Sequence, residues 1–317
     1  MVAPSVSLKP NREFRTGRDA HPHSGEPLHV GIVGVGGPGV FYLDRVAQSF
    51  NYPCKQIAVA SNIAFLRFSR AEDAVLIANH GSHLPTIRDA QLMARDRKSD
   101  ITYFASGLDS AFILTNLYGP ADQGFSSVVA EALGEAGVFT VALKPTGGEI
   151  EGFQSINSLV DVGFEVRLNA IKRDPFAPGT RGRGELLCAA IAQTCRIITF
   201  SLTKLEPMRI GAGELRSILR GDRASIMGYG TGDGAEGCFA AFEAARKSSL
   251  LGQDKISTSR GLMMAIEAKP GILKEKDARA VRNRIGKIAS NRAILHFSAF
   301  ETEGLDSDYR VTILARG

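Results

Sequence analysis

Alternating strands and helices in the first half of the chain constrain its fold more than any other feature of the sequence. Short apolar runs are typical of buried strands, and longer amphipathic segments are typical of helices. Their alternation favours an α/β fold with a Rossmann-like, doubly wound parallel sheet. We expect strands at 28–33, 56–60, 101–105 and 138–143, and helices at 40–50, 86–97 and 126–134.

A long apolar segment separates this half from a different module. Residues 185–205 contain no Gly or Pro, which predicts one mostly buried helix of about twenty residues, close to 30 Å long. The residues after it predict a smaller α+β domain with its own core. Its strands are expected at 225–227, 261–268, 293–300 and 309–316, and its helices at 236–247 and around 278–288.

These patterns divide the chain into four parts: a tail at 1–27, a Rossmann-like domain at 28–184, a central helix at 185–206 and a C-terminal α+β domain at 207–317. The tail mixes Pro, Ser, Gly, Arg and His without an apolar centre, which predicts disorder rather than a secretory signal. No stretch approaches the roughly 20 uninterrupted apolar residues that a bilayer crossing needs. We therefore expect a cytoplasmic protein.

The cysteines and histidines do not predict a metal site. Cys54, Cys188, Cys195 and Cys238 lack CxxC spacing, which favours free thiols in a reducing compartment. Cys188 and Cys195 lie seven apart on the long helix, so we expect both to be small buried side chains on one face. The pair His80 and His83 has no evident third ligand, so we expect solvated histidines.

The chain is mildly basic, with a formal charge of +5 and a pI near 9.1. This balance favours acidic partners, although an uneven surface without any partner explains it equally well. The basic helix at 278–292 has no interleaved aromatic residues, so nucleic acid is not the partner we expect.

A glycine cluster between the first strand and the first helix is the main candidate site. Gly34, Gly36, Gly37 and Gly39 fit GxGxxG, in which backbone N–H groups approach a phosphate at a helix N-terminus. A dinucleotide site would also need an acid after the second strand, where the sequence is Ala60-Ser61-Asn62. An NADP site resting on Ser61 and Arg67, and a tight turn without ligand, remain alternatives. Pro38 removes one donor from this loop.

Several motifs resemble the bacterial FtsZ branch of the tubulin/FtsZ family, in order and over residues 28–317. They are GVGGPGVFYLDR at 34–45, SSVVAEAL at 126–133, TVALKP at 140–145, ELRSIL at 214–219, ASIMGYG at 224–230 and YRVTILARG at 309–317. The resemblance implies the tubulin/FtsZ fold: a Rossmann-like GTPase domain, a central helix and a C-terminal domain. It also implies subunits that stack head to tail, with the loop after the central helix inserting acids into the next subunit's GTP site.

The phosphate loop departs from the family pattern. The family's GGGTG(T/S)G matches 118–124, where only Gly119 and Gly124 keep glycine. Tyr118 and Pro120 obstruct close backbone approach, and Asp122 brings a negative charge towards a polyphosphate. The apolar segment 108–117 before it is extra and unexplained.

The base and ribose positions give a mixed result. The family's ribose acceptor is matched by Glu151, but the arginine expected after it is Ser155. On the central helix the usual Asn-Asp pair falls on Cys188-Ala189 or, with an insertion, on Gly184-Glu185. In the second alignment, Glu185 supplies a carboxylate that could accept hydrogen bonds from guanine. An acidic residue in the first turn of a helix also interacts favourably with the helix dipole, and this role explains Glu185 equally well.

The catalytic loop keeps one carboxylate of two. The family's N-x-D-x-x-D aligns with Arg209, Gly211 and Glu214. Glu214 is thus a vestigial catalytic residue or an ordinary acid in the first turn of a helix.

We therefore expect a pseudo-GTPase that binds GTP or GDP weakly or not at all and acts through filament assembly or by modulating a partner filament. Its basic charge would complement the acidic FtsZ proteins in co-assembly. No membrane-tethering peptide follows Gly317, so we expect no direct tether. The alternatives are an active GTPase using substituted residues, and an NADP-linked oxidoreductase. The vestigial GTP site comprises Gly34, Gly36, Gly37, Gly39, Gly119, Gly124, Glu151 and Glu185, with Glu214 as the catalytic remnant and no metal ligands.

Overall fold

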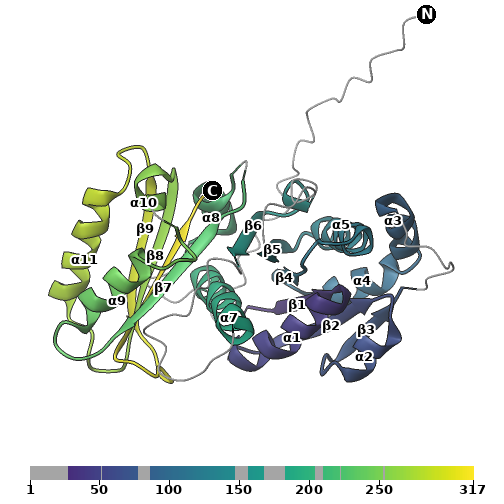
Figure 1. Ribbon diagram of the computed structural model, residues 1–317, viewed down its shortest axis with the longest axis horizontal. Helices are drawn as coiled ribbons and strands as arrows, with labels where there is room; N and C mark the ends of the chain where they lie inside the picture. Colours follow the sequence, from purple (N-terminus) through teal and green to yellow (C-terminus); the bar gives the residue numbers. More distant parts are fainter. Residues whose placement is uncertain are drawn as a thin grey trace, which may run out of the picture.

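Two sheets with a long helix packed between them make up the protein (Figure 1). The computed structural model describes residues 28–50, 52–77, 86–146, 156–167, 183–203, 210–221, 223–252 and 254–317. The expected tail at 1–27 lies outside these ranges. The proposed domain limits fall beside the undescribed stretches 168–182 and 204–209, so they stay predictions.

The first sheet is parallel throughout, with strand order β3-β2-β1-β4-β5-β6. The predicted doubly wound parallel sheet is therefore confirmed. β1 is central and pairs with both β2 and β4, so the strand order reverses between β1 and β4. The strands are β1 (Val30–Val35), β2 (Cys54–Ala60), β3 (Asp73–Leu76), β4 (Ser110–Leu114), β5 (Phe139–Thr146) and β6 (Val162–Arg167).

Helices cover both faces of this sheet, because consecutive strand residues point to opposite sides. Ile32 of β1 packs with α1 and α7, whereas Val33 packs with α3, α4 and α5. The short helix α2 lies near β2 and β3. These helices are α1 (Gly36–Phe50), α2 (Ile63–Phe68), α3 (Ile87–Arg95), α4 (Lys98–Ala105), α5 (Pro120–Glu135) and α7 (Arg183–Leu202).

The expected strand at 101–105 is wrong, because these residues end helix α4. Ile101, Phe104 and Ala105 are buried at positions i, i+3 and i+4, while Tyr103 is exposed, which is the pattern of one helical face. A short apolar run cannot distinguish strand from helix by itself. The strand lies instead in the segment 108–117 that had no explanation, where every residue of β4 is buried.

Helix α7 confirms the predicted long helix and separates the two sheets (Figure 1). Cys188 and Cys195 are buried on it, as expected. Among the described residues, Gly184–Leu202 is the one helix long and apolar enough to cross a membrane, with mean hydropathy 1.4. Since 67% of its apolar window is buried inside the protein, its composition fits a core helix.

The C-terminal module consists of a second sheet and the helices around it. Its strand order is β7-β10-β8-β9, with β10 antiparallel to β7 and β8, and β8 parallel to β9. α9 and α11 pack on one face of the sheet and bury a separate core. The strands are β7 (Ile226–Gly232), β8 (Gly261–Ala268), β9 (Ile294–Glu301) and β10 (Tyr309–Ala315), and the helices are α8 (Ala212–Leu219), α9 (Gly237–Arg246), α10 (Lys255–Thr258) and α11 (Glu275–Ile288).

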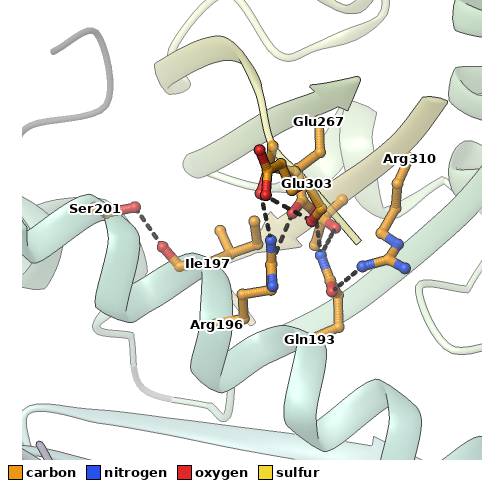
Figure 2. A network of polar contacts seen from close by, with 9 residues as sticks. Gln193, Arg196, Ile197, Ser201, Glu267, Glu303 and Arg310 are labelled. Carbon is orange, nitrogen blue, oxygen red and sulfur yellow. Dashed lines mark hydrogen bonds and ion pairs between the residues drawn. The ribbon is translucent and has the colours of Figure 1, made fainter. Parts of the chain in front are cut away.

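A buried polar network joins α7 to this second sheet (Figure 2). The Glu267 side chain on β8 is fully buried, and its Oε1 accepts from Arg196 Nε at 2.8 Å. Its Oε2 accepts from Gln193 Nε2 at 2.5 Å. Gln193 in turn accepts from Arg310 Nη1 on β10 at 3.1 Å. The network fixes α7 against β8 and β10, because an unpaired charge here would be strongly unfavourable.

Candidate functional site

The candidate site lies at the carboxyl ends of β1 and β4, where α1 and α5 begin. In open α/β sheets, ligands bind at the point where the strand order reverses, and here that point is between β1 and β4. The first N–H groups of a helix favour an anion at such a place. α1 begins at Gly36 rather than Val40, so most of the glycine cluster forms its first turn. Pro38 is tolerated there because first-turn N–H groups have no partner within the helix.

Gly34 and Gly39 allow α1 to pack closely on the sheet. A Cβ at Gly34 would lie 2.7 Å from the Gly39 oxygen. A Cβ at Gly39 would overlap the backbone oxygen of Leu114 at the end of β4. Both positions therefore require glycine for helix–strand packing, whether or not a ligand binds.

Gly36 faces an acidic side chain of the same protein. Its φ is +73°, and a Cβ built there would overlap the carboxylate of Asp122. Asp122 lies in the first turn of α5. Its carboxylate thus lies beside the first residue of α1, close to where the N-terminus of that helix favours an anion. Burial raises the pKa of the Asp122 carboxyl to about 6.

An aromatic ring packs against Gly37. A Cβ at Gly37 would lie 2.6 Å from the ring of Phe65, which belongs to α2. Phe65 is 46% exposed, and its neighbours Ile63 and Phe68 on the same helix are also exposed. The space beside Gly36 and Gly37 is therefore filled by a carboxylate and an apolar ring.

The two glycines retained from the phosphate loop have different environments. Gly119 is the N-cap of α5, and no described atom lies within 4 Å of its Cβ position. Gly124 is within α5, where a Cβ would lie 2.5 Å from the Ala90 Cβ and 2.7 Å from the Ile87 oxygen. Gly124 therefore allows α3 and α5 to pack closely, whereas Gly119 is open to a ligand.

The start of α7 brings Glu185 towards α1. Glu185 is exposed in the first turn of α7, a position that is compatible with both of its expected roles. Cys188 lies about one turn after Glu185 on α7. Burial is the main cause that raises the pKa of its thiol; the nearby Glu185 adds to this shift, and Arg45 opposes it. Burial also raises the pKa of Tyr42 on α1, with smaller effects from Cys188 and Tyr118. The start of α7 and the adjoining part of α1 therefore lie close enough for their side chains to interact electrostatically.

Glu214, the expected catalytic remnant, lies apart from this crevice, in the C-terminal module. Glu214 is exposed in the first turn of α8, which packs against β8 and β9. Glu151, Arg209, His80 and His83 lie outside the described residues, so their roles stay predictions. In the part of the chain that the structure describes, no group of three His, Cys, Asp or Glu side chains is arranged to hold a metal ion.

Lys144 is a buried charged residue near the carboxyl end of β5 that the sequence patterns did not single out. It is 3% exposed and lies opposite Glu165 in the β5–β6 register. Burial lowers the pKa of the Lys144 ammonium, and Glu165 opposes that shift. The sequence feature that could have identified Lys144 is its single charge within the otherwise mostly apolar run TVALKP.

Known proteins similar to this chain have the same architecture. No protein-family model matches it. The cell division protein FtsZ 1 of Archaeoglobus fulgidus is 21% identical over 308 residues, covering 91% of this chain and 82% of that protein. An empty FtsZ dimer from M. jannaschii superposes with a TM-score of 0.75 at 19% identity, covering 93% of this chain and 89% of that one. CetZ2 from Haloferax volcanii, in a GTPγS-bound protofilament, gives a TM-score of 0.68 at 16% identity, covering 92% and 93%.

Proposed function

Because the chain is a divergent FtsZ-like protein with the tubulin/FtsZ fold, we propose that it is a pseudo-GTPase of the cytoplasm. It binds GTP or GDP weakly or not at all. It acts by assembling with copies of itself or by joining or modulating a filament of an FtsZ-type protein.

The position of Asp122 carries the proposal about nucleotide. Its carboxylate lies against Gly36 at the start of α1, where a phosphate would receive its first backbone donors. At pH 7 a carboxyl with a pKa of about 6 is mostly ionised. Two like unit charges 4 Å apart repel by about 4 kcal/mol at the effective dielectric of a protein surface. Because the carboxyl can take up a proton instead, at a cost of about 1.4 kcal/mol at pH 7, its charge weakens phosphate binding about tenfold.

Two features support assembly without nucleotide. The C-terminal module keeps a complete sheet with its own buried core, and the Arg196–Glu267 ion pair joins it to α7. The M. jannaschii FtsZ structure that this chain resembles is an empty dimer. Subunit contacts of this fold are therefore a reasonable expectation here even with the crevice filled by Asp122.

Sedimentation tests the proposal. The full chain is centrifuged alone, with GTP, with GDP, and with a genuine FtsZ, at several salt concentrations. We expect pelleting alone or with FtsZ that does not depend on added nucleotide. Co-pelleting driven by the basic charge should weaken as salt rises. Pelleting of this chain by itself that requires GTP, or no association with itself or with FtsZ filaments at any salt, contradicts the proposal.

An active GTPase is the second candidate, and two observations favour it. Gly119 is open beside the crevice, and Glu185 is exposed at the start of α7. In this alternative the phosphates bind at α5 and Glu185 contributes to base recognition. This alternative predicts that the protein releases phosphate from GTP at a rate that depends on protein concentration.

A further inference from the structure

An arginine-lined hollow lies at one end of the C-terminal module, apart from the β1–β4 crevice. Its volume is about 480 Å³. We call it the arginine hollow and define it by its lining residues: Gly213, Arg216, Ser217, Arg220, Gly221 and Arg316.

The fold brings three arginines together here. Arg216 and Arg220 are four residues apart at the end of α8, so they project from the same face of the helix. Arg316 follows β10, and its backbone N–H donates to the Gly261 oxygen at 2.9 Å. Gly221 allows the chain to turn close to Arg316, because a Cβ there would lie 3.0 Å from the Arg316 Nε. Each of the three side chains is half-buried.

Basic side chains predominate among the described residues that line the hollow. Arg216 pairs with Asp161 at 2.6 Å, and its side chain remains 43% exposed. None of the described residues that line the hollow is acidic. The Ser217 hydroxyl is neutral and donates to the backbone oxygen of Glu214. The main-chain oxygen of Gly317 lies at the rim near Gly221. The hollow therefore presents three guanidinium groups, of which Arg216 shares its charge with Asp161, and no described acidic lining residue.

We propose that the arginine hollow binds an acidic segment of a partner protein through its Asp and Glu carboxylates. The planar guanidinium group binds a carboxylate through two parallel hydrogen bonds. The hollow is shallow and open, so a single small ion would remain mostly hydrated in it. A peptide with several carboxylates engages the arginines together, because each bound carboxylate raises the local concentration of the next. This proposal does not depend on the loss of GTP binding.

The test uses a fluorescein-labelled peptide of six glutamates and the full-length chain, with binding followed by fluorescence anisotropy. We expect saturable binding that weakens as salt rises. The double change Arg220→Glu and Arg316→Glu should weaken binding at least about tenfold, which corresponds to about 1.4 kcal/mol. Arg88→Glu is the matched control, since Arg88 is exposed in the first turn of α3, where an acid is well tolerated.

Further arms separate the outcomes. Arg220→Lys keeps the positive charge but loses the two parallel hydrogen bonds of a guanidinium group, so we expect peptide affinity between those of the wild type and the double variant. If the double variant does not fold, Arg220→Lys alone tests the role of the guanidinium group. Thermal unfolding checks each variant. Inorganic phosphate should compete for the hollow only at concentrations far above those of the peptide. The proposal is overturned if the peptide does not bind, if Arg88→Glu weakens it equally, or if phosphate competes as well as the peptide does.

Discussion

The carboxylate of Asp122 is an ionisable group in a partly buried position at the candidate site. It lies beside Gly36 at the start of α1, and burial raises its pKa to about 6 from the ordinary 3.8. The folded protein therefore binds a proton more tightly at this carboxyl than the unfolded chain does. Such a group stabilises the fold at low pH, and that stabilisation is lost as the pH rises towards and through about 6.

Asp122→Asn should remove this pH dependence. The amide stays neutral, so the variant should gain stability relative to the wild type as the pH rises from about 4 to 7. We expect a gain of about 1–2 kcal/mol at pH 7, less than the full shift implies, because the carboxyl is only partly buried. Urea unfolding at pH 4.5, 5.5, 6.5 and 7.5 measures the difference. A difference that is the same at all four pH values contradicts the assignment.

The glycines of α5 provide a second test at the residue scale. Gly124 touches α3, so Gly124→Ala should destabilise the protein by about 1–3 kcal/mol through overpacking. Gly134 lies in the same helix with no described atom within 4 Å of its Cβ position. Gly134→Ala should therefore stabilise the helix by up to about 1 kcal/mol. Thermal unfolding of the two variants measures the contrast; equal effects would show that Gly124 does not act through packing.

At the scale of elements, the buried network on α7 is one connection between the two sheets, beside a shared apolar cluster and the backbone bonds between β6 and Ser225. Glu267 is fully buried and receives charged or polar donors from Arg196 and Gln193. Removing one partner of a buried ion pair leaves an uncompensated charge, and this costs far more than breaking an exposed pair.

Glu267→Gln should therefore destabilise the protein by about 3–5 kcal/mol. Glu275→Gln is the control, because the Glu275 side chain is 78% exposed in its pair with Arg279. That control should change the free energy of unfolding by less than about 1 kcal/mol. Urea unfolding midpoints compare the two variants. If Glu267→Gln is as mild as the control, the network does not hold α7 to β8.

Sequence patterns predicted the longer elements well and the short ones poorly. The parallel sheet, α7 and β8 follow from sustained burial patterns, and the expected limits of β8 match the structure. The segment 98–114 was misassigned, because four or five apolar residues fit a helix end and a strand equally. The short elements α2, β3 and β6 were missed for the same reason.

The candidate site was predicted only in part. The charge of Asp122 was recognised from its place in the altered phosphate loop, but its contact with Gly36 depends on how α1 and α5 meet in space. Phe65 was not foreseen at all, since α2 itself was missed. The packing role of Gly124 likewise needs the position of α3, which no local pattern gives. Sequence therefore located the crevice, and tertiary contacts decided what fills it.

At the scale of the whole molecule, the protein keeps the architecture of the FtsZ proteins while its ligand crevice is filled by its own side chains. The net charge of +5 and the arginine hollow both favour acidic partners. We propose that assembly and nucleotide binding are separable in this chain, and nucleotide binding then decides between a pseudo-GTPase and an active enzyme.

The most direct measurement is an equilibrium titration of the full chain with fluorescent GTP at pH 7, beside a genuine FtsZ as positive control. We predict affinity weaker than that of the control by at least about tenfold, which corresponds to the cost of about 1.4 kcal/mol for protonating Asp122 at pH 7. Affinity equal to that of the control, followed by release of phosphate, would contradict this account.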